Sequence, residues 1–171
     1  SPRQHFTHPK TCELVTRCNL FTARICRGSS RAMKIVTWNV NSIRARLDRS
    51  IEWLDQHQPD VVCLQETKVE DSGFPYEPLG NLGYDAVHYG QRTYNGVALL
   101  LRGRAQAVVK GFSDGNEEDA QSRIIAADIT LADTVARIVS VYVPNGQSVD
   151  SDKYAYKLAW LERFKRYLAP H

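Results

Sequence analysis

The sequence has one methionine, four cysteines and no long apolar run. A helix that crosses a bilayer needs roughly 20 apolar residues, whereas the longest runs here, such as Val97–Leu101, have the length of a strand. No membrane-spanning segment is expected. Cys12, Cys18 and Cys26 match no paired zinc-site spacing. We interpret them as unpaired thiols in a reducing, cytoplasmic environment, and we expect Cys63, which lies in an apolar run, in the core.

Strong basicity is also missing from most of the chain. The net charge is +3, but residues 1–32 carry six Lys/Arg and one acid, Glu13, whereas residues 33–171 carry 16 bases and 18 acids. Any contact of the main body with nucleic acid must therefore come from locally placed basic side chains and not from a general field.

Residues 1–32 show no apolar period and contain several turn-forming residues, which predicts an unstructured N-terminal extension. Strand-like sequence begins directly after Met33, so we interpret Met33 as a natural initiator that has further sequence in front of it. The alternative is an organellar transit peptide, because the segment is rich in arginine and poor in acids. Residues 33–171 are expected to form the folded part.

Strand and helix patterns alternate from residue 33 onward. Strands are predicted over residues 34–38, 61–65, 96–102, 105–111, 123–131 and 135–143, and helices over residues 46–58 and 151–168. The last four strands follow one another, which is typical of a meander. The apolar face of the last helix is expected to contain Tyr154, Leu158, Leu161 and Leu168, with Asp150 or Ser151 as its N-cap. The fold class is α/β, with a mixed sheet and flanking helices.

Polar side chains follow three of the predicted strands. Asn39 and Asn41 come after the first strand and Glu66 after the second, while Tyr142 and Asn145 lie at the end of the last. If the first two strands are parallel neighbours joined by a helix, their carboxyl ends meet at one edge of the sheet, where open α/β sheets bind ligands. An amide and a carboxylate there could hold Mg²⁺, which prefers oxygen ligands.

Each of these residues also has a plain structural explanation. Asn39 can be a turn former, Glu66 can be a solvated acid at a strand end, and residues 144–146 (Pro-Asn-Gly) form a common turn. Each explanation is sufficient for its residue alone. Three polar strand ends in one chain favour a common site.

Five short blocks of sequence occur in the order and spacing of one enzyme family. They are Trp38-Asn39-Val40-Asn41-Ser42-Ile43-Arg44-Ala45, Leu64-Gln65-Glu66-Thr67-Lys68, Tyr94-Asn95-Gly96-Val97, Ser122-Arg123-Ile124-Ile125 and Val141-Tyr142-Val143-Pro144-Asn145-Gly146. With these blocks the chain resembles the exonuclease III type of apurinic/apyrimidinic endonuclease, in the endonuclease/exonuclease/phosphatase superfamily. The resemblance extends from residue 33 to about residue 168.

This resemblance implies a DNA repair nuclease of base excision repair that hydrolyses phosphodiester bonds with Mg²⁺, or with Mn²⁺ as a substitute. Glu66 would be the metal carboxylate, Asn39 an active-site amide that organises metal and phosphate, and Tyr142 a group that reaches the scissile phosphate. The DNA contacts would be Arg44, Ala45, Lys68, Tyr94 and Asn145. The substrate would be double-stranded DNA with an abasic site or a 3′ end. Alternatively, Lys68 is a solvated loop lysine and Arg44 pairs with Asp48 on a helix face.

The segments that this family carries in its second half are missing after Asn145. Neither a Gly-Asp-Xaa-Asn segment nor a terminal Ser-Asp-His occurs there. We therefore expect residues 33–171 to be the first half of a layered α/β sandwich, inactive alone, either as a fragment or as a chain that needs a partner to supply the second half. Two other functions stay open: a phosphatase or phosphodiesterase of the same superfamily, and a non-catalytic module for DNA binding or assembly.

Overall fold

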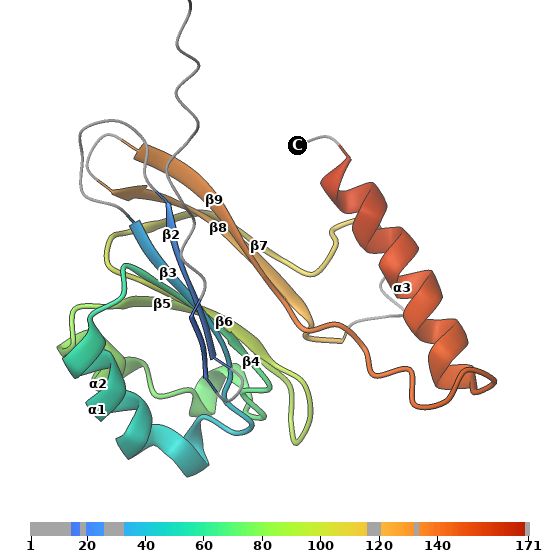
Figure 1. The fold of residues 1–171 in the computed structure, drawn as a ribbon, viewed down its shortest axis with the longest axis horizontal. Coiled ribbons are helices and arrows are strands. Elements are labelled where there is room, and N and C mark those ends of the chain that lie inside the picture. The colour runs from blue at the N-terminus through green and yellow to red at the C-terminus, as the bar shows by residue number, and fades with distance from the viewer. Residues whose placement is uncertain (1–14, 18–19, 26–32, 116–120, 132–133, 170–171) are drawn as a thin grey trace, which may run out of the picture.

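A computed structural model describes residues 15–17, 20–25, 33–115, 121–131 and 134–169 (Figure 1). The predicted free thiols Cys12, Cys18 and Cys26 lie outside these residues, as does most of the predicted N-terminal extension. Within the described part, no helix combines the length and the apolar character needed to cross a membrane.

A six-stranded mixed sheet carries one face of the core, with strand order β1-β2-β3-β4-β6-β5. Its strands are β1 (Val15–Arg17), β2 (Leu20–Ile25), β3 (Met33–Asn39), β4 (Val61–Gln65), β5 (Asp85–Tyr89) and β6 (Val97–Leu101). Only β3 and β4 are parallel; the other neighbouring pairs are antiparallel. Helix α1 (Leu47–His57) connects β3 to β4, as a parallel pair requires a crossover.

A second, antiparallel sheet contains β7 (Ala105–Lys110), β8 (Ile124–Leu131) and β9 (Thr134–Val141) in this order. The two sheets pack face to face, because alternate residues of β6 and β8 point toward each other. One apolar cluster joins Val97, Leu99 and Leu101 to Ile125 and Ile129. All five side chains are fully buried, and burial of each such side chain is worth about 1.5–3 kcal/mol.

Helices cover the other face of the first sheet. Leu54 and Ile51 of α1, together with Leu79 of α2 (Tyr76–Asn81), pack on Val62 and Leu100. In the same layer Trp38 meets Trp53 edge to face, with ring centroids 5.7 Å apart. Two short 3₁₀ helices, η1 (Arg44–Arg46) and η2 (Asp71–Gly73), complete the loops at the ends of β3 and β4. The predicted α/β class, with a mixed sheet and flanking helices, is confirmed.

The C-terminal helix α3 (Asp152–Leu168) lies beside the second sheet, on the side away from α1 and α2 (Figure 1). Ser151 is its N-cap, since the Ser151 hydroxyl accepts a hydrogen bond from the Tyr154 backbone N–H at 3.2 Å. The predicted apolar face is wrong for Leu158 and Leu168, which are 50% and 43% exposed, whereas Tyr154 and Leu161 are half-buried. The buried residue is Trp160, whose ring packs against Phe112 and so ties α3 to the loop after β7.

Two further expectations differ from the structure. The predicted meander is divided between two sheets: residues 97–101 join β4 and β5 in the first sheet, and only β7, β8 and β9 form a meander. The five side chains of β6 are all buried, and such a strand needs cover on both faces. In addition, β1 and β2 lie within the segment that was expected to be unstructured, and β2 pairs with β3 along its length.

Candidate active site

The parallel register of β3 and β4 places two polar side chains at the same edge of the first sheet. Asn39, the last residue of β3, is opposite Gln65, the last residue of β4, and Glu66 follows directly. The Asn39 amide nitrogen donates a hydrogen bond to Glu66 Oε1 at 2.7 Å. The predicted convergence of this amide and this carboxylate is therefore present in the structure.

The second sheet brings Tyr142 to the same point. Gln65 Nε2 donates to Ser140 Oγ at 3.3 Å, and this hydroxyl donates to the backbone oxygen of Leu64 at 3.2 Å. These buried bonds hold the end of β9 against the end of β4. Tyr142, two residues beyond Ser140, then donates its hydroxyl to the Glu66 carboxylate.

Glu66 is surrounded by hydrogen-bond donors at the edge of the sheet, with its side chain 20% exposed. Lys68 Nζ lies 3.1 Å from Glu66 Oε2. Burial by itself would raise the pKa of Glu66, but hydrogen bonds from Asn39, Lys68 and Tyr142, together with the Lys68 charge, outweigh burial and hold the pKa below its usual value. Glu66 is therefore an ionised carboxylate at neutral pH.

Tyr142 stays protonated for the complementary reasons. Burial is the largest cause that raises the pKa of its hydroxyl, and the hydrogen bond to Glu66 and the Glu66 charge raise it further. The nearby Arg123 guanidinium, 4.9 Å from the centroid of the Tyr142 ring, opposes these effects without reversing them. Tyr142 can therefore act as a neutral hydrogen-bond donor at the site.

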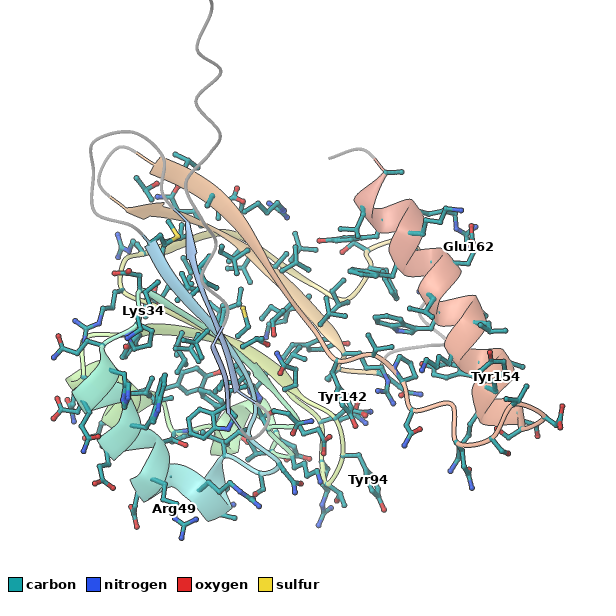
Figure 2. All side chains as sticks on the ribbon, viewed as in Figure 1. Lys34, Arg49, Tyr94, Tyr142, Tyr154 and Glu162 are labelled. Carbon is teal, nitrogen blue, oxygen red and sulfur yellow. The ribbon has the colours of Figure 1, made fainter. Side chains whose placement is uncertain are left out.

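An open pocket with a volume of about 560 Å³ adjoins Tyr142. Its lining is largely polar or aromatic and consists of Gln91, Tyr94, Asn95, Gln121, Arg123, Tyr142, Asn145, Gln147 and Lys153. Figure 2 shows Tyr94 and Tyr142 close together at one end of the sheets. Tyr94 is 68% exposed, so its ring is available to a ligand that enters the pocket.

The structure brings together only some of the predicted DNA contacts. Lys68 bridges the Glu66 carboxylate and the side-chain oxygen of Asn41, while Tyr94 and Asn145 line the pocket. Arg44 and Ala45 lie on the exposed 3₁₀ helix η1, outside the pocket lining.

A network of amide side chains holds Arg123 at the pocket, and no feature of the sequence predicted this network. Gln121 Oε1 accepts a hydrogen bond from Arg123 Nε at 2.7 Å and another from Asn95 Nδ2 at 3.3 Å. Gln91 accepts from the same Asn95 amide and from the backbone N–H of Ser122. These residues come from two separate loops, so no local motif could have indicated their contact.

The donor set fits a hard divalent cation, although only in part. Glu66 offers ionised oxygens, and the side-chain oxygen of Asn39 accepts one hydrogen bond, from Asn41 N–H at 3.1 Å, which leaves it a second lone pair. Among the described residues no cluster of three His, Cys, Asp or Glu side chains is present. A cation held here would keep water or phosphate in most of its coordination positions, as Mg²⁺ commonly does.

Comparison with known proteins agrees with this geometry. The sequence pattern of the endonuclease/exonuclease/phosphatase family matches residues 36–169. The chain belongs to this family. The resemblance inferred from the five sequence blocks is thereby confirmed. The names of similar family members are those of nucleases that act on DNA.

Among these relatives is exodeoxyribonuclease III of Haemophilus influenzae, 39% identical over 137 residues, which are 80% of this chain and 51% of that protein. Another is the DNA repair nuclease APEX1 of Danio rerio, 31% identical over 82% of this chain and 45% of its own length. The chain thus spans about half the length of the curated relatives that it matches.

Solved structures of the family give the same picture. An AP endonuclease from Archaeoglobus fulgidus is 43% identical, with a TM-score of 0.72 over 78% of this chain and 50% of its own. The 3′ phosphatase NExo from Neisseria, bound to a product DNA hairpin, is 39% identical, with a TM-score of 0.75 over 80% of this chain and 51% of its own.

Proposed function

We propose that this chain provides the metal-binding half of a Mg²⁺-dependent DNA repair nuclease of the exonuclease III and AP endonuclease type. The observation that carries the proposal is the ionised Glu66, held by Asn39 and Tyr142 beside a polar pocket at the edge of the sheets. Hydrolysis of a phosphodiester requires groups that balance the charge developing on phosphate oxygens and that hold the phosphate in line.

Glu66 and Asn39 would hold the cation, which when bound would neutralise developing charge on the phosphate. Tyr142 and Arg123 both line the adjoining pocket. There the Arg123 guanidinium can donate to a phosphate oxygen, and the Tyr142 hydroxyl can do so once it exchanges Glu66 for the phosphate. Lys68 adds a positive charge next to the carboxylate. All three groups position a phosphate and none is a reader of base sequence, as suits an enzyme that recognises a lesion or a strand end.

The relatives and the pocket together support a proposal for the substrate class. The similar proteins are named for apurinic or apyrimidinic sites, for exonuclease action and for a 3′ phosphatase bound to DNA. We therefore propose double-stranded DNA with an abasic site or a 3′ end as the substrate, and a second protein segment, equivalent to the other half of the relatives, as the partner. Mn²⁺ is expected to replace Mg²⁺.

The test is a substrate panel with the chain and a separately produced second half of the Haemophilus influenzae relative. Three substrates are compared in Mg²⁺: a duplex with an abasic site, a duplex with a 3′ phosphate, and a phosphoinositide. We expect DNA turnover that disappears with chelator and falls by orders of magnitude in Glu66→Gln, with little change in melting temperature. The matched control is Glu70→Gln, which changes an exposed acid outside the site.

Each alternative function has its own outcome in this panel. Turnover of the phosphoinositide alone would favour a phosphatase of the same superfamily. DNA binding without turnover in every mixture would favour a non-catalytic module. Near-normal activity of Glu66→Gln would contradict the role of Glu66 as the metal carboxylate.

A further inference from the structure

We propose that Thr67 and His88 form a buried hydrogen-bonded pair that positions the Glu66 carboxylate for metal binding. The inference rests on the proposed function, because it assigns a positioning role toward the same carboxylate. Neither side chain reaches the pocket: Thr67 is 0% and His88 is 1% exposed. They would act through the backbone turn that carries Glu66.

The turn after β4 has an unusual backbone. Glu66 and Lys68 both have φ of 54°, a left-handed conformation that is unfavourable for residues with a side chain. Thr67 lies between them and points in the opposite direction, into the core. A turn with two such residues persists only where its surroundings fix it, so the contacts of Thr67 bear directly on where Glu66 lies.

Backbone bonds from Thr67 N–H to Gly96 O at 3.2 Å and from Lys68 N–H to Asn95 O at 3.0 Å hold the main chain of this turn. One side-chain bond anchors Thr67 itself. Thr67 Oγ1 lies 2.8 Å from His88 Nε2 on strand β5. The imidazole is stacked on Phe74, with ring centroids 4.1 Å apart. Its other nitrogen, Nδ1, is 2.9 Å from Asp71 Oδ1, although the orientation is not aligned for a hydrogen bond. The Asp71 charge favours a proton on Nδ1, which leaves Nε2 as the acceptor for the Thr67 hydroxyl.

Two glycines leave room for this pair and allow no larger residue. A Cβ on Gly96 would overlap the Thr67 hydroxyl, and a Cβ on Gly90 would overlap both the His88 ring and the Val69 backbone oxygen. The backbone at Gly90 and Gly96 is thus in direct van der Waals contact with the pair. Asp71 extends the support, since it accepts from Gly90 N–H at 2.7 Å and pairs with Lys110 of β7 at 2.8 Å.

The same turn connects to the loop after Asn39. The backbone oxygen of Glu66 accepts from Ser42 N–H at 2.7 Å, and that of Thr67 accepts from Ile43 N–H at 3.1 Å. A shift of Thr67 would therefore move Glu66 and its partner loop together. Because supporting residues behind metal ligands fix ligand orientation, loss of the Thr67 hydroxyl should weaken the cation site without removing any ligand.

The experiment compares Thr67→Val, which is isosteric but lacks the hydroxyl, with Thr67→Ser, which keeps it. We expect Thr67→Val to weaken Mn²⁺ binding, measured by electron paramagnetic resonance of the free ion, by about tenfold, the lower end of effects seen for outer-shell partners. It should also speed hydrogen exchange of the Ser42 and Ile43 amides. Thr67→Ser should stay close to wild type, as should the control Thr130→Val at an exposed strand position.

The outcomes separate this inference from the proposed function. If the wild-type chain binds no Mn²⁺, the proposed function fails and the positioning role fails with it. If wild type binds but Thr67→Val matches it in affinity or in amide exchange, only the positioning role is overturned. Equal losses in Thr67→Ser and Thr67→Val would also overturn it, because packing and not the hydroxyl would then matter. His88→Phe, which keeps the stacked ring, tests the same bond if Thr67→Val does not fold.

Discussion

At Glu66, the neighbours of one carboxyl group decide its charge. Burial favours the neutral acid, whereas three donors and one positive charge favour the anion. The second effect is larger, so the pKa of Glu66 is lowered. A carboxyl group whose pKa is lowered in the folded state stabilises that state above its unfolded pKa. This contribution is lost as the pH falls through the folded pKa.

Tyr142→Phe removes one of the three donors and so tests its effect on the pKa of Glu66. The hydroxyl of Tyr142 lowers the pKa of Glu66, so its removal should raise that pKa while Asn39 and Lys68 still hold the carboxylate. The measurement is a carbon-13 NMR titration of the Glu66 side chain. Stability should fall by no more than about 1 kcal/mol, the usual net value of one hydrogen bond. An unchanged Glu66 titration would show that the hydroxyl does not bond to the carboxylate.

The pKa of His88 is also lowered, but by burial and not by hydrogen-bond donors as at Glu66. Burial is the main cause that lowers its pKa to about 4, and Lys110 acts in the same direction, while Asp71 opposes both. The unfolded chain, with a histidine pKa of about 6.5, binds more protons than the folded one between these two values. Stability should therefore decrease as the pH falls from about 6.5 toward about 4, by up to about 3 kcal/mol.

Urea unfolding of wild type and His88→Phe at several pH values measures this effect. Wild type should lose stability through the stated window and level off with respect to His88 below it. The variant has no group that titrates at this position, so the slope between pH 6.5 and 4.5 should be smaller. Equal slopes in the two proteins would mean that folding does not lower the pKa of His88.

At the scale of elements, the apolar pattern predicted best where burial is complete. Strand β4, with five buried side chains, and helix α1, with Leu54 buried and Ile51 partly buried, lie close to where the sequence placed them. In α3 the helical spacing of one tyrosine and three leucines suggested one apolar face, but Trp160 and Tyr167 form the contact with Phe112. This contact with the loop after β7 does not involve the leucines, so their spacing was a poor guide to the packed face.

Other elements have little indication of helix or strand in their sequence. Helix α2 contains Pro78 and Gly80, which are poor helix formers and which predict a loop. Strand β5 has an exposed Asp85 and a buried His88, so it lacks the apolar run of its neighbour β6. These elements form because they pack on the first sheet, and tertiary packing of this kind overrides local preference.

Removal of residues 1–32 tests the role of β2. The rest of the chain should keep its fold, because its two apolar clusters lie within residues 33–171. However, β2 pairs with β3 from Met33 to Trp38, so the shortened chain would expose an unpaired edge of the first sheet. Unpaired edges promote association. We expect an unchanged far-UV circular dichroism signal per residue but a larger mass in sedimentation.

Two results would contradict this prediction. Loss of the far-UV signal on truncation would show that the N-terminal strands are required for the fold. A monomer indistinguishable from the full chain would show that β2 does not protect the edge of β3.

At the scale of the whole molecule, the site could be predicted where strand topology alone determines it. Asn39 and Glu66 meet because parallel neighbours end at one edge. Tyr142 meets them because the second sheet stacks on the first. Its place at a third polar strand end favoured a common site, and the resemblance implied its role there. The place of Arg123 depends on the amide network of Gln121, Asn95 and Gln91, which only the folded arrangement of two loops reveals.

The 171-residue chain alone should cleave DNA only slowly. Enzymes lower such barriers by about 8–23 kcal/mol, shared among charge stabilisation, nucleophile activation and the leaving group. Among the described residues, Glu66 is the one carboxylate at the site, and no cluster of three acidic, histidine or cysteine side chains accompanies it. DNA binding should also weaken steeply with salt, since phosphate contacts dominate it.

An abasic duplex assay with the chain alone, over a range of salt and Mg²⁺, measures both properties. Rapid cleavage that depends on Mg²⁺ and Glu66 would contradict this prediction. It would mean that the water and the leaving group are activated by residues to which we assign structural roles.

The three tryptophans make the two sides of the molecule optically distinguishable. Trp38 and Trp53 contact each other where α1 packs on the first sheet, whereas Trp160 of α3, 2% exposed, packs against Phe112. A chain with Trp38→Phe and Trp53→Phe would therefore emit from α3 alone. The wavelength of its emission maximum would report whether the helix stays packed on Phe112 when metal, DNA or a second protein segment is added.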